Sequence, residues 1–291
     1  MAVIELNDLT KNYGKNRGIK NVSFSVEEGE IFGFIGPNGS GKSTTIRTLL
    51  NYIYPSSGMA AIFGKDIVRD SLTIRRHTGY LPAEVYYYDD MRAGELLRYS
   101  QSFYGKNNNK RIAELAERLD LELNKKIEDL SSGNKKKVAI IQALAHEPKL
   151  LILDEPTGGL DPLMQNTFFR ILREEKQKNT TIFLSSHILS EVQRICDRVA
   201  IIKEGEIIKV EVIEALIRNQ FKKITIILAN DQHQDLAIEG VIKQERLGNR
   251  VHLLYGGKIK ALINNLKDLD IKDLFIEEPT LDEIFMHYYE K

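Results

Sequence analysis

One nine-residue segment restricts the fold of this chain more than any other part of its sequence. The β-rich run IFGFI comes directly before it, and the apolar-periodic stretch TTIRTLLNYI continues from its end. A strand, a glycine-rich loop and a helix in this order fit the pattern G-x-x-x-x-G-K-[ST], which predicts a phosphate-binding loop in an α/β domain. The segment, GPNGSGKST, consists of Gly36, Pro37, Asn38, Gly39, Ser40, Gly41, Lys42, Ser43 and Thr44.

The residue types of this segment suit the phosphates of a nucleotide. Glycines let backbone N–H groups curl around phosphate oxygens, and the start of a helix favours negative charge. Lys42 supplies a positive charge to the β- and γ-phosphates, and Ser43 offers a hydroxyl group to Mg²⁺. A chance glycine turn is the alternative interpretation, and the flanking strand and helix disfavour it.

Two adjacent carboxylates, Asp154 and Glu155, end the continuously apolar run LLILDEP. Such a run is typical of a strand buried on both faces of a parallel sheet, and α/β sheets bind their ligands at the carboxyl ends of the strands. We therefore expect Asp154 to hold Mg²⁺ and Glu155 to orient or deprotonate an attacking water molecule. A helix cap is the alternative role for an acidic pair of this kind.

A histidine, His187, ends another predicted parallel strand, TTIFLSSH. It should therefore emerge at the same edge of the sheet as the phosphate loop and the carboxylates. A lone histidine is more often structural, but this position favours contact with a γ-phosphate.

Together these motifs resemble the ATP-binding subunits of ABC transporters over roughly residues 3 to 210. GPNGSGKST matches the Walker A motif of that family, LLILDEP its Walker B motif, GGLDP at 158–162 its D-loop, and His187 its switch histidine. LSSGN at 130–134 resembles the family signature LSGGQ. The resemblance implies an ATP hydrolase that uses ATP and Mg²⁺, with Glu155, His187 and Lys42 as catalytic residues.

The signature departs from the family pattern, because Ser132 replaces its first glycine and Asn134 its glutamine. Ser131 and Gly133 are retained, and the resemblance assigns both to contact with γ-phosphate. Ser131 can cap a helix whose free N–H groups point at that phosphate. In the family two chains pair head to tail, so that each signature covers the ATP of the other chain, and the partner is a second copy or a second ABC ATPase.

Two further positions carry roles that come from the resemblance. In GYLPAE, Ala83 stands where many members have the glutamine of the Q-loop, and the neighbouring Glu84 is assigned to the metal ion. Tyr13, in LTKNYG, lies where the family uses an aromatic ring to stack on adenine. Simple packing is the alternative for a tyrosine at this position.

The expected fold is an α/β P-loop NTPase of the ABC-ATPase type over residues 1–210, followed by a small C-terminal α+β domain over 211–291. The family core has a mostly parallel sheet, an antiparallel β-subdomain and a helical subdomain, which falls at about 84–140 here. Residues 1–35 read as β-hairpin, and residues 75–149 as mostly helical. After about residue 210, β-rich runs such as KKITIILAN alternate with helical stretches.

A membrane role must come through a partner, since no run approaches the roughly 18 apolar residues of a spanning helix. The resemblance implies a separately encoded permease, with this chain on the cytoplasmic face of the cell membrane. The tyrosine-rich segment 85–105 lies where the family receives the coupling helix of the permease, with helix packing as the alternative. The N-terminus lacks the pattern of a secretory signal, and the single Cys196 fits a reducing compartment.

The ending EEPTLDEIFMHYYEK resembles that of ATPases serving ABC-2 type exporters, a group that includes exporters of drugs and antimicrobial peptides. An apolar stripe in this ending predicts a helix that caps the C-terminal domain or packs against a twin chain. The residues of this stripe are Leu281, Ile284, Phe285 and Tyr288.

Two alternatives stay open at this point: an importer ATPase, and a soluble ABC-type ATPase that acts on nucleic acid or ribosomes. Basic and acidic residues both number 41, so the chain has no net charge with which to recruit nucleic acid. The lysine run 135–137 begins a helix, and we interpret it as a solvated or anion-facing surface.

Overall fold

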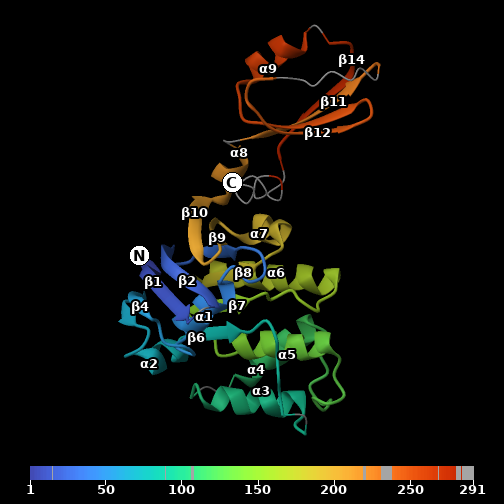
Figure 1. Cartoon of the computed structure of the whole chain (residues 1–291). Coiled ribbons are helices and arrows are strands. Elements are labelled where there is room, and N and C mark those ends of the chain that lie inside the picture. The colour runs from blue at the N-terminus through green and yellow to red at the C-terminus, as the bar shows by residue number, and fades with distance from the viewer. Residues whose placement is uncertain are drawn as a thin grey trace. The chain divides into compact units, whose positions relative to one another are not determined.

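The structure, a computed structural model, describes residues 1–14, 16–88, 90–105, 108–218, 221–230, 238–267, 269–279 and 283. It falls into two compact units, Met1–Val210 and Glu211–Lys291 (Figure 1). The apolar stripe expected at Leu281, Ile284, Phe285 and Tyr288 lies outside the described residues.

A six-stranded sheet forms the centre of the first unit, in the order β10-β9-β3-β8-β7-β6. Neighbouring strands pair in parallel at β3–β8, β3–β9, β7–β8 and β6–β7. Every residue of β3, β7 and β8 is buried, which explains why these runs do not alternate between apolar and polar residues. The strands are β3 (Ile31–Ile35), β6 (Thr78–Leu81), β7 (Leu150–Asp154), β8 (Thr181–Ser186), β9 (Arg198–Lys203) and β10 (Glu206–Val212).

A second, antiparallel sheet packs against the first and has the order β2-β1-β4-β5. Phe24 of β2 stacks on Phe32 of β3 and Phe183 of β8, with ring centroids 5.3 and 6.0 Å apart. Ile46 and Leu49 of α1 (Lys42–Leu49) belong to the same core, so the helix after the phosphate loop is fixed against both sheets. The strands are β1 (Ala2–Tyr13), β2 (Asn16–Glu27), β4 (Ser57–Ile62) and β5 (Lys65–Asp66).

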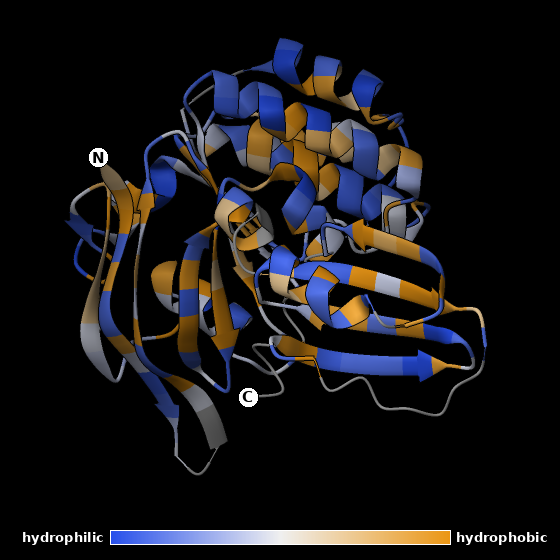
Figure 2. Ribbon diagram, turned by 90° about the horizontal axis from the view of Figure 1, so that it is seen from above, coloured by the Kyte–Doolittle hydropathy of each residue, from blue (hydrophilic) through white to orange (hydrophobic). Residues whose placement is uncertain are grey.

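The helices α4 and α6 are amphipathic, and Figure 2 shows hydrophobic and hydrophilic residues on different sides of helices in this unit. α3, α4 and α5 gather in one part of the unit (Figure 1). Ion pairs fasten this helical part to α6, because Arg111 lies 2.5 Å from Glu175 and Arg118 binds both carboxylate oxygens of Glu174. The helices are α2 (Ser71–Arg76), α3 (Ala93–Ser102), α4 (Asn109–Arg118), α5 (Ser132–Leu144), α6 (Pro162–Gln177) and α7 (Leu189–Ile195).

Two local expectations differ from the structure. The helix predicted over TTIRTLLNYI ends at Leu49, because the backbone at Asn51 turns into the left-handed region with φ 51°. The stretch expected to be mostly helical also contains strand β6, which adds an edge to the central sheet. β6 pairs in parallel with β7, and a Cβ atom on its Gly79 would lie only 2.1 Å from the carbonyl oxygen of Ala143 in α5, so the strand also packs closely against a distant helix.

The second unit has a four-stranded antiparallel sheet in the order β12-β13-β11-β14. Leu262 and Leu266 of α9 pack with Ile224 and Val251 of the sheet into one core. The predicted fold class, an α/β core with a small α+β addition, is confirmed. The elements are α8 (Ile213–Arg218), β11 (Lys222–Leu228), β12 (Val241–Leu247), β13 (Arg250–Tyr255), α9 (Ile259–Leu266) and β14 (Ile271–Glu277).

Candidate active site

Three predicted site residues meet at the carboxyl ends of β3, β8 and β7, which are neighbours in the central sheet. Lys42 follows the loop after β3, His187 follows β8, and Glu155 follows β7. One carboxylate oxygen of Glu155 lies 3.3 Å from Nζ of Lys42, and the other lies 2.5 Å from Nδ1 of His187. The parallel order of the strands thus brings Lys42 together with two groups that come more than 100 residues later in the chain.

The loop Gly36–Thr44 has the backbone that a phosphate cradle needs. Gly39 and Gly41 have φ angles of 77° and 113°, a region that residues with a Cβ atom rarely adopt. A Cβ atom on Gly36 would lie 2.4 Å from the carbonyl oxygen of Ile202, so this position has room for glycine alone. Helix α1 then begins at Lys42 with no acidic residue in its first turn, which leaves the positive end of its dipole available to an anion.

Two buried side chains of this loop fit a phosphate ligand. Lys42 donates hydrogen bonds to the carbonyl oxygens of Gly36 and Pro37 at 2.7 and 3.2 Å, which holds its ammonium group over the loop. Ser40 is buried, and its hydroxyl has no hydrogen-bond partner within the described part of the chain. A buried hydroxyl without a protein partner and a buried ammonium group both gain from binding an oxyanion.

Asp154 ends β7 with only 2% of its surface exposed, and its carboxylate accepts a hydrogen bond of 2.6 Å from the Ser185 hydroxyl on β8. The next residue, Glu155, has the left-handed φ of 48°, and its N–H group donates to both the carbonyl and the hydroxyl of Ser185 at 3.2 Å. The carboxylate of Asp154 and the hydroxyl of Ser43 are hard oxygen donors of the kind that Mg²⁺ prefers. Among the described residues, no group of three or more His, Cys, Asp or Glu side chains has the arrangement of a metal site.

The signature segment lies against the D-loop of the same chain. Ser131 is the N-cap of α5 and accepts a hydrogen bond of 3.3 Å from the N–H group of Asn134. A Cβ atom on Gly133 would lie 2.8 Å from the carbonyl oxygen of Gly159, so this contact requires glycine. Within one chain, no hydrogen bond or ion pair joins Ser131 or Gly133 to residues 36–44, all of which the structure describes.

The interpretation of the lysine run 135–137 as a solvated or anion-facing surface is wrong for two of its members. Lys136 is 2% exposed and Lys137 is 9% exposed. Both ammonium groups donate to backbone carbonyl oxygens, Lys136 to Pro82, Ala83 and Glu155, and Lys137 to Asp120. Sequence reasoning missed Lys136, although its i,i+4 spacing from Ile140 places it on the apolar side of the helix.

The remaining predicted site residues lie apart from this cluster of contacts. Tyr13 ends β1 with 41% of its surface exposed, and the ammonium group of Lys11 lies over its ring, 5.4 Å from the ring centroid. Glu84 is exposed, and its carboxylate accepts a hydrogen bond of 2.8 Å from the hydroxyl of Tyr86. The structure therefore pairs Glu84 with the tyrosine-rich segment instead of with Lys42, Glu155 and His187.

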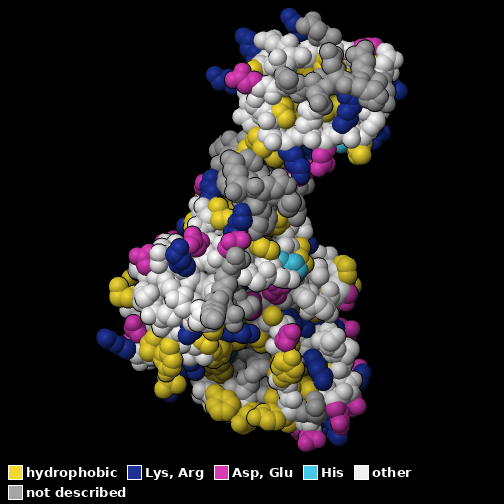
Figure 3. Space-filling view, in the orientation of Figure 1, with side chains coloured by type: hydrophobic (Ala, Val, Ile, Leu, Met, Phe, Trp, Pro, Cys, Tyr) yellow, Lys and Arg dark blue, Asp and Glu magenta, His cyan; other side chains and the backbone are white. Residues whose placement is uncertain are grey.

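The tyrosine-rich segment lines two adjoining pockets of about 450 and 600 Å³. Tyr86 and Tyr88 are 85% and 73% exposed, whereas Tyr87 between them turns inward and donates a hydrogen bond of 3.2 Å to Gln142 of α5. Burial raises the pKa of Tyr87. Figure 3 shows exposed hydrophobic side chains around a hollow on this part of the first unit. Tyr52 and Tyr104 also line the pocket of about 450 Å³.

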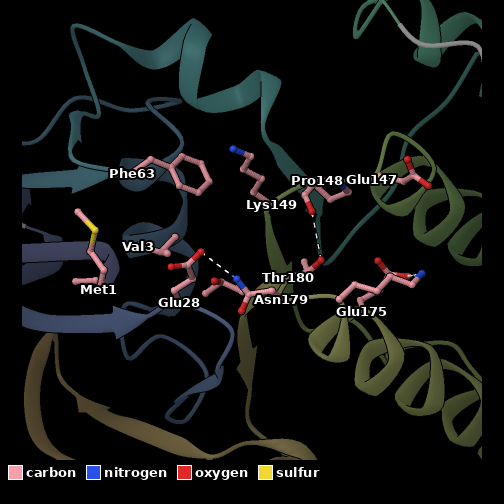
Figure 4. Close-up of a pocket in the computed structure, with 13 residues that line it drawn as sticks. Met1, Val3, Glu28, Phe63, Glu147, Pro148, Lys149, Glu175, Asn179 and Thr180 are labelled. Carbon is pink, nitrogen blue, oxygen red and sulfur yellow. Dashed lines mark hydrogen bonds and ion pairs between the residues drawn. The ribbon is translucent and has the colours of Figure 1, made fainter.

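A further pocket, of about 520 Å³, lies at the opposite edge of the sheet (Figure 4). Its lining includes Lys149, which precedes β7, and Thr181, which begins β8, so it lies at the amino ends of the strands. Glu175 in this lining is occupied by ion pairs with Arg111 and Lys178. None of the residues assigned to the active site contributes to this pocket.

Comparison with known proteins identifies both units. The model of the ABC transporter family matches residues 19–158, and the model of the C-terminal domain of DrrA1-3-like ATP-binding proteins matches residues 215–289. The bacitracin transport ATP-binding protein BcrA of Bacillus licheniformis is 34% identical, over 98% of this chain and 96% of its own length. The linearmycin resistance ATP-binding protein LnrL of Bacillus subtilis is 30% identical, over 98% of this chain and 97% of its own.

Solved structures agree with the sequence relatives. The ATP-binding subunit of an ABC transporter has a TM-score of 0.70 at 32% identity, over 74% of this chain and 91% of that one. A dimeric ATP-binding cassette in a post-hydrolysis state, bound to ADP and phosphate, has a TM-score of 0.67 at 25% identity, over 72% of this chain and 98% of that one.

No helix among the described residues combines the length and the apolar character needed to span a membrane. The family predicted from the motifs is confirmed by a relative that matches along nearly the whole chain. The residues placed at the carboxyl edge of the sheet fit the ATP hydrolysis that this family performs. The chain belongs to the ATP-binding proteins of ABC transporters and is an ATP hydrolase.

Proposed function

We propose that this protein is the motor subunit of an exporter, and that it binds two Mg²⁺-ATP between two ATPase chains. The observation that carries this proposal is the position of Glu155, whose two carboxylate oxygens meet Lys42 and His187 at the mouth of the phosphate loop. A base, a phosphate-binding cation and a second polar group at one point are what hydrolysis of a γ-phosphate requires.

Each residue has a distinct part in this reaction. Glu155 orients the attacking water and accepts its proton, and Lys42 moves its ammonium group from the loop carbonyls to the β- and γ-phosphates. His187, at the end of β8, contacts the γ-phosphate as a polar group beside Glu155. Ser43 and Asp154 hold Mg²⁺, which supplies charge neutralisation at the phosphate oxygens when bound.

The signature segment binds the ATP that is held by the phosphate loop of the partner chain. Ser131 caps α5, and the first N–H groups of this helix are therefore oriented toward an incoming γ-phosphate. Dimeric cassettes among the solved relatives support pairing of this kind. ATP then joins the two chains, and hydrolysis loosens them by removing an anionic bridge.

The surface for the membrane partner is the aromatic hollow around Tyr86, Tyr87 and Tyr104. Exposed tyrosines beside apolar side chains are typical of the central part of a protein interface. Through this contact the chain would sit at the cytoplasmic face of the cell membrane, bound to a separately encoded permease. Relatives named for bacitracin transport and linearmycin resistance favour export of antimicrobial compounds over import or over a soluble role on nucleic acid.

Replacement of the proposed base tests the reaction. In Glu155→Gln we expect ATP turnover by the full chain to fall by about 10²-fold or more, with the affinity for ATP unchanged. Glu147→Gln is the matched control, because Glu147 is also a glutamate with a left-handed backbone, φ 54°, and is exposed far from the site. Near-normal turnover in Glu155→Gln would remove Glu155 as the base.

A further inference from the structure

A buried lysine in the signature helix contacts two loops of the active-site edge. Lys136 lies in the second turn of α5, and its ammonium group donates to the carbonyl oxygens of Pro82 at 2.9 Å, Ala83 at 3.0 Å and Glu155 at 3.4 Å. Pro82 and Ala83 follow β6, and Glu155 follows β7, its parallel neighbour. The side chain therefore bridges the carboxyl ends of two adjacent strands.

Burying the ammonium group of Lys136 costs free energy. If the position needed only to be filled, an apolar side chain would serve without that cost. Removal from water disfavours the charged form and lowers the pKa of Lys136 to about 8, although the carboxylates of Asp154 and Glu155 act in the opposite direction. A methionine of similar length would fill the space without this cost. The three carbonyl contacts are what the ammonium group adds.

Glu155, whose carbonyl oxygen Lys136 binds, has a strained backbone conformation. A φ of 48° is unfavourable for a residue with a Cβ atom, so neighbouring groups must hold it in place. Ser185 accepts hydrogen bonds from the N–H group of Glu155, and Lys136 binds its carbonyl oxygen. The direction of the Glu155 carboxylate toward Lys42 and His187 depends on this backbone conformation.

We propose that Lys136 is a positioning residue for ATP hydrolysis: it clamps the Glu155 carbonyl to the loop after β6 and so aims the Glu155 carboxylate. The inference rests on the proposed role of Glu155 as the base. Lys136 itself is too deeply buried to serve as a surface for nucleotide, and all its hydrogen bonds go to backbone oxygens of the same chain.

The test compares Lys136→Met, Lys136→Gln and the control Lys137→Met in the full chain, with Glu155→Gln measured beside them. Lys137 is also buried and also binds a carbonyl, that of Asp120, but touches no residue of the site. We expect kcat to fall by about 10- to 100-fold in Lys136→Met, with KM and ATP affinity within about twofold of wild type. Lys136→Gln retains two N–H donors, so its kcat should lie between those of Lys136→Met and the wild type. Lys137→Met should keep its kcat within about twofold of the wild type.

A folded Lys136→Met or Lys136→Gln protein with wild-type kcat would overturn the inference, as would equal losses of kcat in Lys136→Met and Lys137→Met. If Lys136→Met does not fold, Lys136→Gln decides, since a wild-type kcat in that variant contradicts the clamp and a reduced kcat with unchanged KM supports it. The Glu155→Gln arm separates the two proposals. If kcat falls strongly in Glu155→Gln but not in the Lys136 variants, the role of Glu155 as the base is supported and only the role of Lys136 is contradicted.

Discussion

Oε2 of Glu155 lies 2.5 Å from Nδ1 of His187, at hydrogen-bond distance between the ends of β7 and β8. A carboxylate at this nitrogen favours the imidazole form in which Nδ1 carries the proton. The same carboxylate therefore orients the histidine and, as the proposed base, the attacking water.

Loss of the histidine should slow hydrolysis without preventing binding. In His187→Ala we expect kcat to fall by about 100-fold with ATP affinity within about twofold, because the ring acts on γ-phosphate only as the bond breaks. His252→Ala is the control, since His252 bonds to Thr225 in the second unit. Steady-state turnover and nucleotide titration measure both quantities, and equal turnover in the two variants would contradict the assignment.

A large cationic side chain in the signature segment should prevent ATP-dependent dimerisation without weakening ATP binding. Ser131→Arg removes the cap of α5 and places a long side chain where the partner's ATP would lie. Because the proposed contact is between chains, the isolated variant should bind ATP with wild-type affinity yet form no ATP-dependent dimer. Ser102→Arg, on an exposed serine at the end of α3, should dimerise normally. Loss of ATP affinity in the Ser131→Arg monomer would show that the signature acts within its own chain.

The exposed ring of Tyr13 should contribute stacking energy to nucleotide binding. Stacking of a base on an aromatic side chain is worth about 1–3 kcal/mol, so Tyr13→Ala should weaken ATP binding by about 5- to 150-fold. Tyr13→Phe keeps the ring and should bind as the wild type does. Calorimetric titration distinguishes the two, and an unchanged affinity in Tyr13→Ala would assign this ring to packing.

Burial of Lys136 predicts how stability depends on pH. Its pKa is about 8 in the folded protein and 10.5 when unperturbed, so between these values the unfolded chain binds a proton that the folded chain has lost. The free energy of unfolding should therefore rise with pH in this window, by up to about 1.4 kcal/mol per pH unit from this group. Below pH 8 both states are protonated and the contribution is constant.

Other groups titrate in the same window, so the measured quantity is the difference between wild type and Lys136→Met. Urea unfolding at pH 8 and at pH 10 should show the wild type gaining stability relative to the variant. A difference that does not change with pH would mean that Lys136 keeps an ordinary pKa despite its burial.

The phosphate loop and the Asp154–Glu155 pair were predictable because each sits in a short strand–loop pattern that local sequence defines. Lys136 was not, because its role comes from carbonyl groups 54 and 53 residues earlier and 19 residues later in the chain. Strand β6 was missed for a related reason, since the contact of Gly79 with α5 is a tertiary one. The i,i+4 spacing from Ile140 could indicate that Lys136 is buried, but local sequence does not show which distant carbonyl groups it binds.

The mass of Glu155→Gln in solution tests the shared-ATP arrangement most directly. Slow hydrolysis should trap two chains around two nucleotides, so light scattering with Mg²⁺-ATP should give twice the chain mass of 33.2 kDa, and the chain mass itself without nucleotide. Adding Ser131→Arg to Glu155→Gln should return the ATP-bound protein to a monomer. A protein that binds ATP but keeps the chain mass in Glu155→Gln, or a dimer that persists when Ser131→Arg is added, would contradict a nucleotide held between signature and phosphate loop of two chains.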